Sequence, residues 1–261
     1  MDIKKIIKQD KEPFYNIEKD PKKFIKKYNS KYQTLYYRKK LQEVLKLIDF
    51  SLKGKKVLDI GCCGGYLSLI LSKKGAIVTG IDSSKYAINA AEYNAKINKI
   101  NNCQFINENF NKIELSEKYD LIIAKDVIEH IQEDEKFLKK ISLLLKENGK
   151  LIITTQNSFS FNYIFEGMIR KILGQKKWIG WDSTHVRWYN FLKLQKKFEK
   201  ANLKIKNYSG SYFFPYQIIK LITKKEPKNK SYTLIGDYFG NKKPFNVMGW
   251  SISAIGEKRN V

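Results

Sequence analysis

Short apolar runs alternate with stretches of helical periodicity through the middle of the chain. Five runs rich in Val, Ile and Leu have the pattern of buried strands: residues 56–60, 76–81, 103–106, 120–124 and 150–155. Three stretches between them predict helices: near residues 64–74, 84–98 and 133–147. Strands that alternate with helices at this spacing indicate a doubly wound parallel sheet, which binds its ligands at the carboxyl ends of the strands.

The segments before this core differ from it in pattern. Residues 1–32 are polar and rich in Lys, with weak periodicity, so we expect a loosely held N-terminal extension. Residues 33–51 place apolar side chains at helical intervals and predict an amphipathic helix that leads into the core. The main domain is therefore expected over residues 33–261.

The segment after the fifth strand, residues 157–190, is rich in aromatic side chains and too long for an ordinary connection. We interpret it as a cap inserted over the strand ends. Residues 191–205 predict a basic amphipathic helix followed by a strand, and residues 248–258 predict a strand paired antiparallel at the sheet edge. The predicted fold class is thus α/β, with a doubly wound, mostly parallel seven-stranded sheet of Rossmann-like type.

The net charge of +24 lies on the two flanks of the chain. Residues 1–57 contain 17 basic and 7 acidic residues, residues 58–157 contain 13 of each, and residues 158–261 carry an excess of +14. Basic flanks would concentrate an anionic partner: RNA, an acidic membrane surface or a phosphorylated metabolite. Lysines spread over solvated faces would give the same composition without any partner.

The remaining composition limits the class of protein. No apolar run approaches the roughly 20 residues of a membrane span, and the first residues lack the apolar stretch of a secretory signal, so we expect a cytoplasmic protein. The three cysteines offer no CxxC metal spacing, and we expect reduced thiols. No obligate protein partner is evident.

A glycine-rich turn follows the first strand of the core. Asp59, Gly61, Gly64 and Gly65 lie where the chain leaves this strand and begins a helix. Glycines at such a turn let the backbone approach a ligand, and the helix N-terminus points free N–H groups at it. Asp82 ends the next strand, where a carboxylate can accept both hydroxyls of a ribose.

This turn resembles motif I of the class I S-adenosylmethionine-dependent methyltransferases, D-x-G-x-G-x-G, through Asp59, Gly61 and Gly65, with Cys63 in place of the central glycine. The resemblance extends over about residues 33–205. It implies S-adenosylmethionine as the cofactor. The positions it implies for cofactor binding are Arg38, Asp59, Gly61, Cys63, Gly65, Asp82, Asn109 at the adenine, and Lys125 just beyond the fourth strand.

An acid and histidine cluster follows the fourth strand. Asp126, Glu129 and His130 form D-x-x-E-H, and His185 comes from the predicted cap. The order of these motifs resembles two methyltransferase groups in which E-x-x-E-H binds Mg²⁺: the O-methyltransferases of ubiquinone biosynthesis and the small-RNA 2′-O-methyltransferases. The resemblance implies Mg²⁺ held by Asp126, Glu129 and His130, with His185 as a further ligand. In the alternative, Glu129 caps a helix and His130 packs against the sheet.

Three functions are consistent with these observations. The leading hypothesis is an O-methyltransferase for a small or lipid-like hydroxylated acceptor, with Glu129, His130 and His185 as catalytic residues and His130 as general base if no metal is bound. The second is an RNA methyltransferase that uses the basic flanks, although no RNA-binding module is recognisable. The third is a cofactor-binding protein without catalysis. The aromatic cap would cover the acceptor or rest on an anionic membrane surface.

Overall fold

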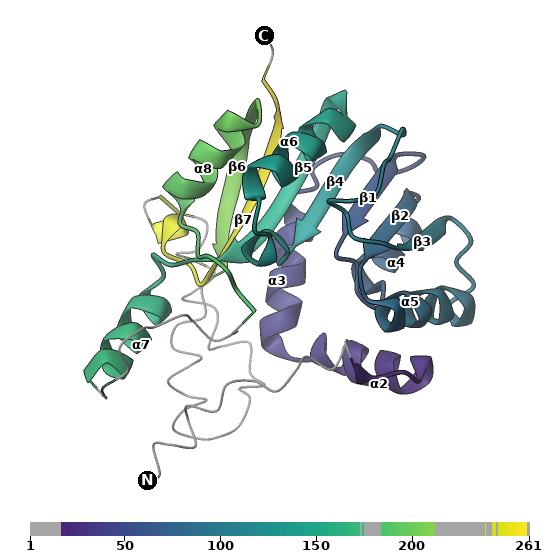
Figure 1. Ribbon diagram of the computed structural model, residues 1–261, viewed down its shortest axis with the longest axis horizontal. Coiled ribbons are helices and arrows are strands. Elements are labelled where there is room, and N and C mark those ends of the chain that lie inside the picture. Colours follow the sequence, from purple (N-terminus) through teal and green to yellow (C-terminus); the bar gives the residue numbers. More distant parts are fainter. Residues whose placement is uncertain are drawn as a thin grey trace.

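The computed structural model describes residues 17–172, 174, 184–211, 238, 242–243 and 245–259 (Figure 1). The middle of the predicted cap, residues 175–183, lies outside the described residues, as do residues 1–16 of the predicted extension. No helix in the described part of the chain is long and apolar enough to cross a bilayer.

Seven strands form one sheet in the order β3-β2-β1-β4-β5-β7-β6. Their bounds are β1 Lys56–Ile60, β2 Ile77–Asp82, β3 Cys103–Asn107, β4 Tyr119–Lys125, β5 Leu145–Gln156, β6 Leu203–Ser211 and β7 Ser251–Lys258. The five strands predicted in the core are all present, and they pair in parallel. The predicted fold class is confirmed.

The last strand is antiparallel, as predicted, but its predicted place at the sheet edge is wrong. β7 lies between β5 and β6 and pairs antiparallel with both, so that β6 is the edge strand. The physical reason is visible in the burial of β7, whose first six residues are all buried. A strand that is buried along its length gains more from two neighbours than from one edge position.

Helices cover both faces of the sheet (Figure 1). α3 (Leu35–Lys46) and α4 (Tyr66–Lys73) share one hydrophobic core with alternate strand residues such as Val57 and Leu121. α6 (Asp134–Leu144) and α8 (Phe191–Lys200) share a second core with the intervening residues, such as Leu58 and Ile122. Successive strand residues point to opposite faces, so the two cores lie on opposite sides.

The N-terminal segment is more closely attached than the sequence predicted. Pro21–Lys31 forms α2, whose N-cap Asp20 accepts hydrogen bonds from two backbone N–H groups. Phe24 and Ile25 of α2 are buried against Ala87 and Ala90 of α5 (Lys85–Ile97). The expectation of a loosely held extension is therefore wrong for residues 21–31, because two apolar side chains are enough to anchor this short helix.

The predicted cap begins with a tight turn and a helix. Asn157 forms an isolated bridge with Tyr189, which brings the two ends of the segment together. Between them, α7 (Phe161–Ile172) extends away from the sheet (Figure 1), and Met168 and Ile172 are exposed. Of the described cap residues, only Thr184 and His185 line the pocket that opens at the strand ends.

Candidate active site

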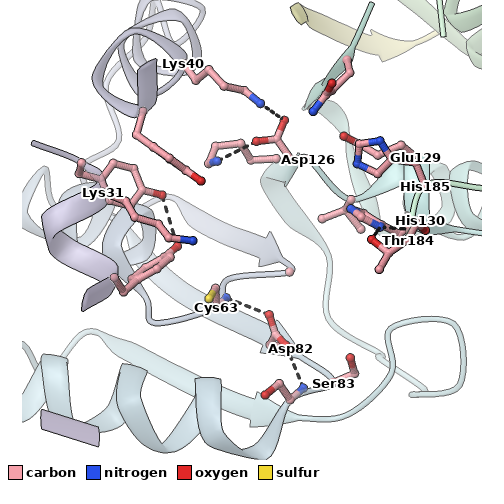
Figure 2. Close-up of a pocket in the computed structure, with 18 of the residues that line it drawn as sticks. Lys31, Lys40, Cys63, Asp82, Ser83, Asp126, Glu129, His130, Thr184 and His185 are labelled. Carbon is pink, nitrogen blue, oxygen red and sulfur yellow. Dashed lines mark hydrogen bonds and ion pairs between the residues drawn. The ribbon is translucent and has the colours of Figure 1, made fainter. Parts of the chain in front are cut away.

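A pocket of about 490 Å³ opens at the carboxyl ends of β1, β2 and β4 (Figure 2). The strands supply its floor, and α2 and α3 supply one wall. The lining residues that carry polar groups or aromatic rings are Tyr28, Lys31, Tyr32, Tyr36, Tyr37, Lys40, Cys63, Asp82, Ser83, Ser84, Lys125, Asp126, Glu129, His130, Gln156, Thr184 and His185. This is the edge of the sheet where the sequence placed the ligand site.

The glycine-rich turn after β1 has a left-handed backbone at Gly61, Cys63 and Gly65. Gly61 has φ of 70°, and a Cβ there would lie 2.5 Å from Val127 Cγ2. Gly65 has φ of 74° and is the N-cap of α4. Cys63, at the position of the family's central glycine, also has a left-handed φ, of 47°. Residues other than glycine rarely adopt this left-handed conformation. Cys63 nevertheless has the backbone conformation that a glycine would have at this position.

Asp82 and Cys63 are joined across the two strand ends. One carboxylate oxygen of Asp82 accepts a hydrogen bond from the Cys63 backbone N–H at 2.9 Å, and the other accepts from the Ser84 N–H at 2.9 Å (Figure 2). Burial raises the pKa of Asp82 above its usual value. Each oxygen has a second lone pair, so the carboxylate can still accept the hydroxyls of a ribose.

Asp59 lies beneath the pocket and does not line it. Its carboxylate accepts a hydrogen bond from Ser68 Oγ at 2.6 Å, and burial raises its pKa to about 6. Ser68 belongs to α4, so Asp59 ties the end of β1 to the helix that follows the glycine turn. Asp59 therefore supports the glycine turn from beneath the pocket.

Asp126 is held between two lysines. Its carboxylate lies 2.5 Å from Lys40 Nζ of α3 and 3.0 Å from Lys125 Nζ (Figure 2). Thr154 Oγ1 also donates to it at 3.0 Å. Burial disfavours its ionised form, but the two ammonium groups hold the pKa of Asp126 well below its usual range. Asp126 is therefore a carboxylate that is already paired.

Glu129, His130 and His185 meet at the end of the pocket opposite Asp82. Their ligand atoms all lie within 4.8 Å of one another. Glu129 is 1% exposed, and neither of its carboxylate oxygens has a hydrogen-bond partner of good geometry among the described residues. Burial, and then the charge of Asp126, raise the pKa of Glu129 to about 8. The ring of His130 lies edge-on to that of His185, with centroids 4.7 Å apart.

Thr184 fixes the orientation of His130. Nδ1 of His130 lies 3.0 Å from Thr184 Oγ1 and 3.3 Å from the Thr184 carbonyl oxygen. When Nδ1 carries the proton and donates it to that carbonyl, Nε2 is left as the basic nitrogen. Thr184 and His185 come from the end of the predicted cap, residues 157–190, and complete this end of the site.

The predicted metal set differs from the set that the structure groups. Asp126 is engaged by Lys40 and Lys125, and it is His185 that joins Glu129 and His130. One carboxylate with two imidazoles suits Zn²⁺ or Mn²⁺ better than Mg²⁺, which prefers oxygen ligands. The predicted Mg²⁺ set of Asp126, Glu129 and His130 stays a prediction, and the Glu129 carboxylate with the two imidazoles could hold a cation through nitrogen and oxygen together.

The structure gathers most of the predicted site residues, but not all of them. Gly61, Cys63, Asp82, Lys125, Asp126, Glu129, His130 and His185 line the pocket. Arg38, Asp59, Gly65 and Asn109 do not line it, and the Asn109 side chain caps the Asn111 N–H at 2.9 Å. The sequence analysis missed Lys40 and the tyrosines of α2 and α3. Tyr28 lies on α2, Tyr32 is the C-cap of that helix and Tyr36 lies on α3, so no single helical periodicity links these side chains.

Comparisons with known proteins agree with this geometry. Residues 51–205 match the family model described as a methyltransferase domain. A ubiquinone biosynthesis O-methyltransferase of Pelagibacter ubique is 35% identical over 170 residues, which is 63% of this chain and 68% of that protein. The protein of the same name from Coxiella burnetii (strain Dugway 5J108-111) is 37% identical over 119 residues, 44% of this chain and 49% of that protein.

Solved structures show the same fold at low identity. Magnesium protoporphyrin IX methyltransferase from Synechocystis PCC 6803, solved with bound S-adenosylhomocysteine, aligns with a TM-score of 0.59 at 18% identity and covers 86% of this chain and 85% of its own. An S-adenosylmethionine-dependent methyltransferase from Clostridium acetobutylicum aligns with a TM-score of 0.60 at 14% identity, over 90% of this chain and 99% of its own. The family match, the fold and the pocket lead to one conclusion: the chain belongs to the S-adenosylmethionine-dependent methyltransferases.

Proposed function

We propose that this methyltransferase transfers the methyl group of S-adenosylmethionine to a hydroxyl oxygen of a small acceptor. The observation that carries the proposal is the position of Glu129, His130 and His185 at one end of a pocket whose other end holds Asp82. The ribose end and the acceptor end are thus separate, and the sulfonium methyl lies between them. The O-methyltransferases among the relatives support oxygen as the atom methylated.

The reaction needs little covalent help from the protein, because the sulfonium is already activated. The acceptor oxygen forms a bond to the methyl carbon while the carbon–sulfur bond breaks and its electron pair returns to sulfur. When no cation is bound, the hydroxyl proton goes to Nε2 of His130, which Thr184 orients through Nδ1. Alignment of the oxygen with the methyl group contributes much of the rate.

Glu129 and the two imidazoles are also the residues that would hold a divalent cation. Such a cation would lower the pKa of the acceptor hydroxyl and orient its oxygen. The aromatic side chains in and around the pocket favour a ring-shaped or lipid-like acceptor. Tyr36 and Tyr37 line the pocket, and Trp188 packs against the His185 ring with centroids 5.2 Å apart.

The test is a transfer of radiolabelled methyl from S-adenosylmethionine to a fractionated lysate. We expect label in the small-molecule or lipid extract with the wild-type protein, and a loss of about 10²- to 10⁴-fold for His130→Ala, the range for a general base. Gln132→Ala, two residues away, is the control that should keep the wild-type rate. Label found in RNA or protein, or full activity of His130→Ala, would contradict the proposal.

A further inference from the structure

The end of the predicted cap is tied to the segment that carries Glu129 and His130. The backbone N–H of Val186 donates a hydrogen bond to the Glu129 carbonyl oxygen at 2.9 Å. His185 precedes Val186, and its ring lies 4.7 Å from that of His130, measured between centroids (Figure 2). His185 belongs to no helix or strand of the described chain, so its position depends on the contacts of its own segment.

A buried carboxylate, Asp134 at the start of α6, holds the residues that follow His185. One oxygen of Asp134 lies 2.6 Å from Arg187 Nη1 and accepts a hydrogen bond from the Tyr189 hydroxyl at 2.7 Å. The other oxygen accepts from Lys197 Nζ of α8 at 2.9 Å. Burial disfavours the ionised form, but the hydrogen bonds from these partners hold the pKa of Asp134 below its usual value. Asp134 is therefore a carboxylate that joins the cap to α6 and α8.

The contacts of the cap segment alternate along the chain. His185 meets Glu129, and the next two alternate residues, Arg187 and Tyr189, both meet Asp134. A spacing of two is that of an extended chain, in which a slip by one residue turns the other set of side chains inward. The two contacts at Asp134 therefore fix the register that brings an imidazole to Glu129.

We propose that Asp134 is a positioning residue, which sets the place of His185 at the acceptor end of the pocket. Asp134 acts through Arg187 and Tyr189, since it does not line the pocket itself. The inference rests on the proposed function, which puts the acceptor beside His130 and His185. A catalytic group displaced by about 1 Å can lower a rate by about 10²-fold even when the change lies far from the chemistry.

The test uses the two histidines of the chain, whose ring protons give separate NMR signals. A nuclear Overhauser cross-peak between the two rings reports their contact in the full-length protein. Asp134→Ala removes the carboxylate, and Arg187→Met removes its partner in the cap but leaves Asp134 bonded to Lys197. Arg187→Met therefore decides the question if Asp134→Ala fails to fold. Glu135→Gln is the matched control, because the ion pairs of Glu135 among the described residues are with Lys197 and Lys200.

We expect the cross-peak in the wild-type protein and in Glu135→Gln, and its loss in Asp134→Ala and in Arg187→Met. The double variant should differ little from Asp134→Ala, because both changes remove the same contact. Calorimetry should give an affinity for S-adenosylhomocysteine within about threefold of the wild-type value in every folded variant, since Asp134 lies outside the pocket. A purely structural role would lower the melting temperature and leave the cross-peak of the folded protein in place.

A cross-peak that is kept in either folded variant, or that is absent from the wild-type protein, would overturn the inference. The methyl-transfer assay separates that result from a failure of the proposed function. A loss of transfer of up to about 10²-fold in Asp134→Ala, together with loss of the cross-peak, would support both. Loss of the cross-peak with full transfer would support the positioning of His185 by Asp134 and contradict the place of His185 at the acceptor.

Discussion

Glu129→Gln is expected to stabilise the protein, and the gain should grow with pH. The Glu129 carboxyl is buried and lacks a hydrogen-bond partner of good geometry among the described residues. Burial, with Asp126 nearby, raises its pKa from 4.5 to about 8. Folding therefore favours the protonated form. The stability that Glu129 contributes is fully present below pH 4.5 and is lost as the pH rises through 8.

The expected loss of stability follows from the shift in the pKa of Glu129. Each pKa unit corresponds to about 1.36 kcal/mol, so a shift of about 3.5 units gives an upper limit of about 5 kcal/mol between pH 4.5 and pH 9. Relaxation of the pocket and entry of water lower this limit, and we expect roughly 3 kcal/mol. Glutamine keeps the shape of the neutral acid and cannot ionise, so the Glu129→Gln protein does not lose this stability as the pH rises.

The assay is urea unfolding of both proteins at pH 5, 7 and 9 in the presence of a chelator. The difference in free energy of unfolding should be near zero at pH 5 and largest at pH 9. Glu133→Gln, whose side chain is 63% exposed, is the control and should show a small difference that does not change with pH. A constant difference for Glu129→Gln would refute the reasoning, because it would mean that Glu129 is ionised in the folded protein across this range.

Three further predictions concern the rest of the site. Asp82→Ala should weaken S-adenosylhomocysteine by about 10- to 150-fold in calorimetry, because the ribose loses its carboxylate partner; unchanged affinity would mean that the nucleotide binds elsewhere. Cys63→Gly should raise the free energy of unfolding by up to about 1 kcal/mol, since the left-handed backbone at this position suits glycine, whereas Cys103→Gly at the start of β3 should lower it. A Cys63→Gly protein less stable than wild type would show that the thiol packing outweighs the backbone strain. Cobalt added to the protein should give a visible absorption band, which Glu129→Gln and His185→Ala should abolish and Asp126→Asn should retain. Loss of the band in Asp126→Asn would instead support Asp126 as a metal ligand, as the sequence predicted.

The sheet and its ligand edge could be predicted because they depend on local patterns. The centre of β4 and the second half of β5 are short buried runs, and the glycine turn after β1 carries its own backbone signal at Gly61 and Gly65. The position of β7 could not be predicted, since the choice between an edge and an interior place depends on how β6 pairs with it far along the chain.

The side-chain partners in the site were less accessible to sequence reasoning. The D-x-x-E-H spacing does not show how Asp126 and Glu129 lie, because Asp126 has a φ of 57° and precedes the short helix η2 (Ile128–His130). Its true partner, Lys40, is 86 residues away in the chain, and no local pattern links the two. The role of α2 was also missed, because two buried residues in a Lys-rich segment give a weak periodic signal.

The most direct test of the account is a crystal structure of the protein with S-adenosylhomocysteine bound. We predict the ribose hydroxyls on the Asp82 carboxylate and the sulfur open toward His130 and Glu129. A ligand bound with its sulfur turned away from His130, or with its ribose remote from Asp82, would contradict the proposed path of methyl transfer.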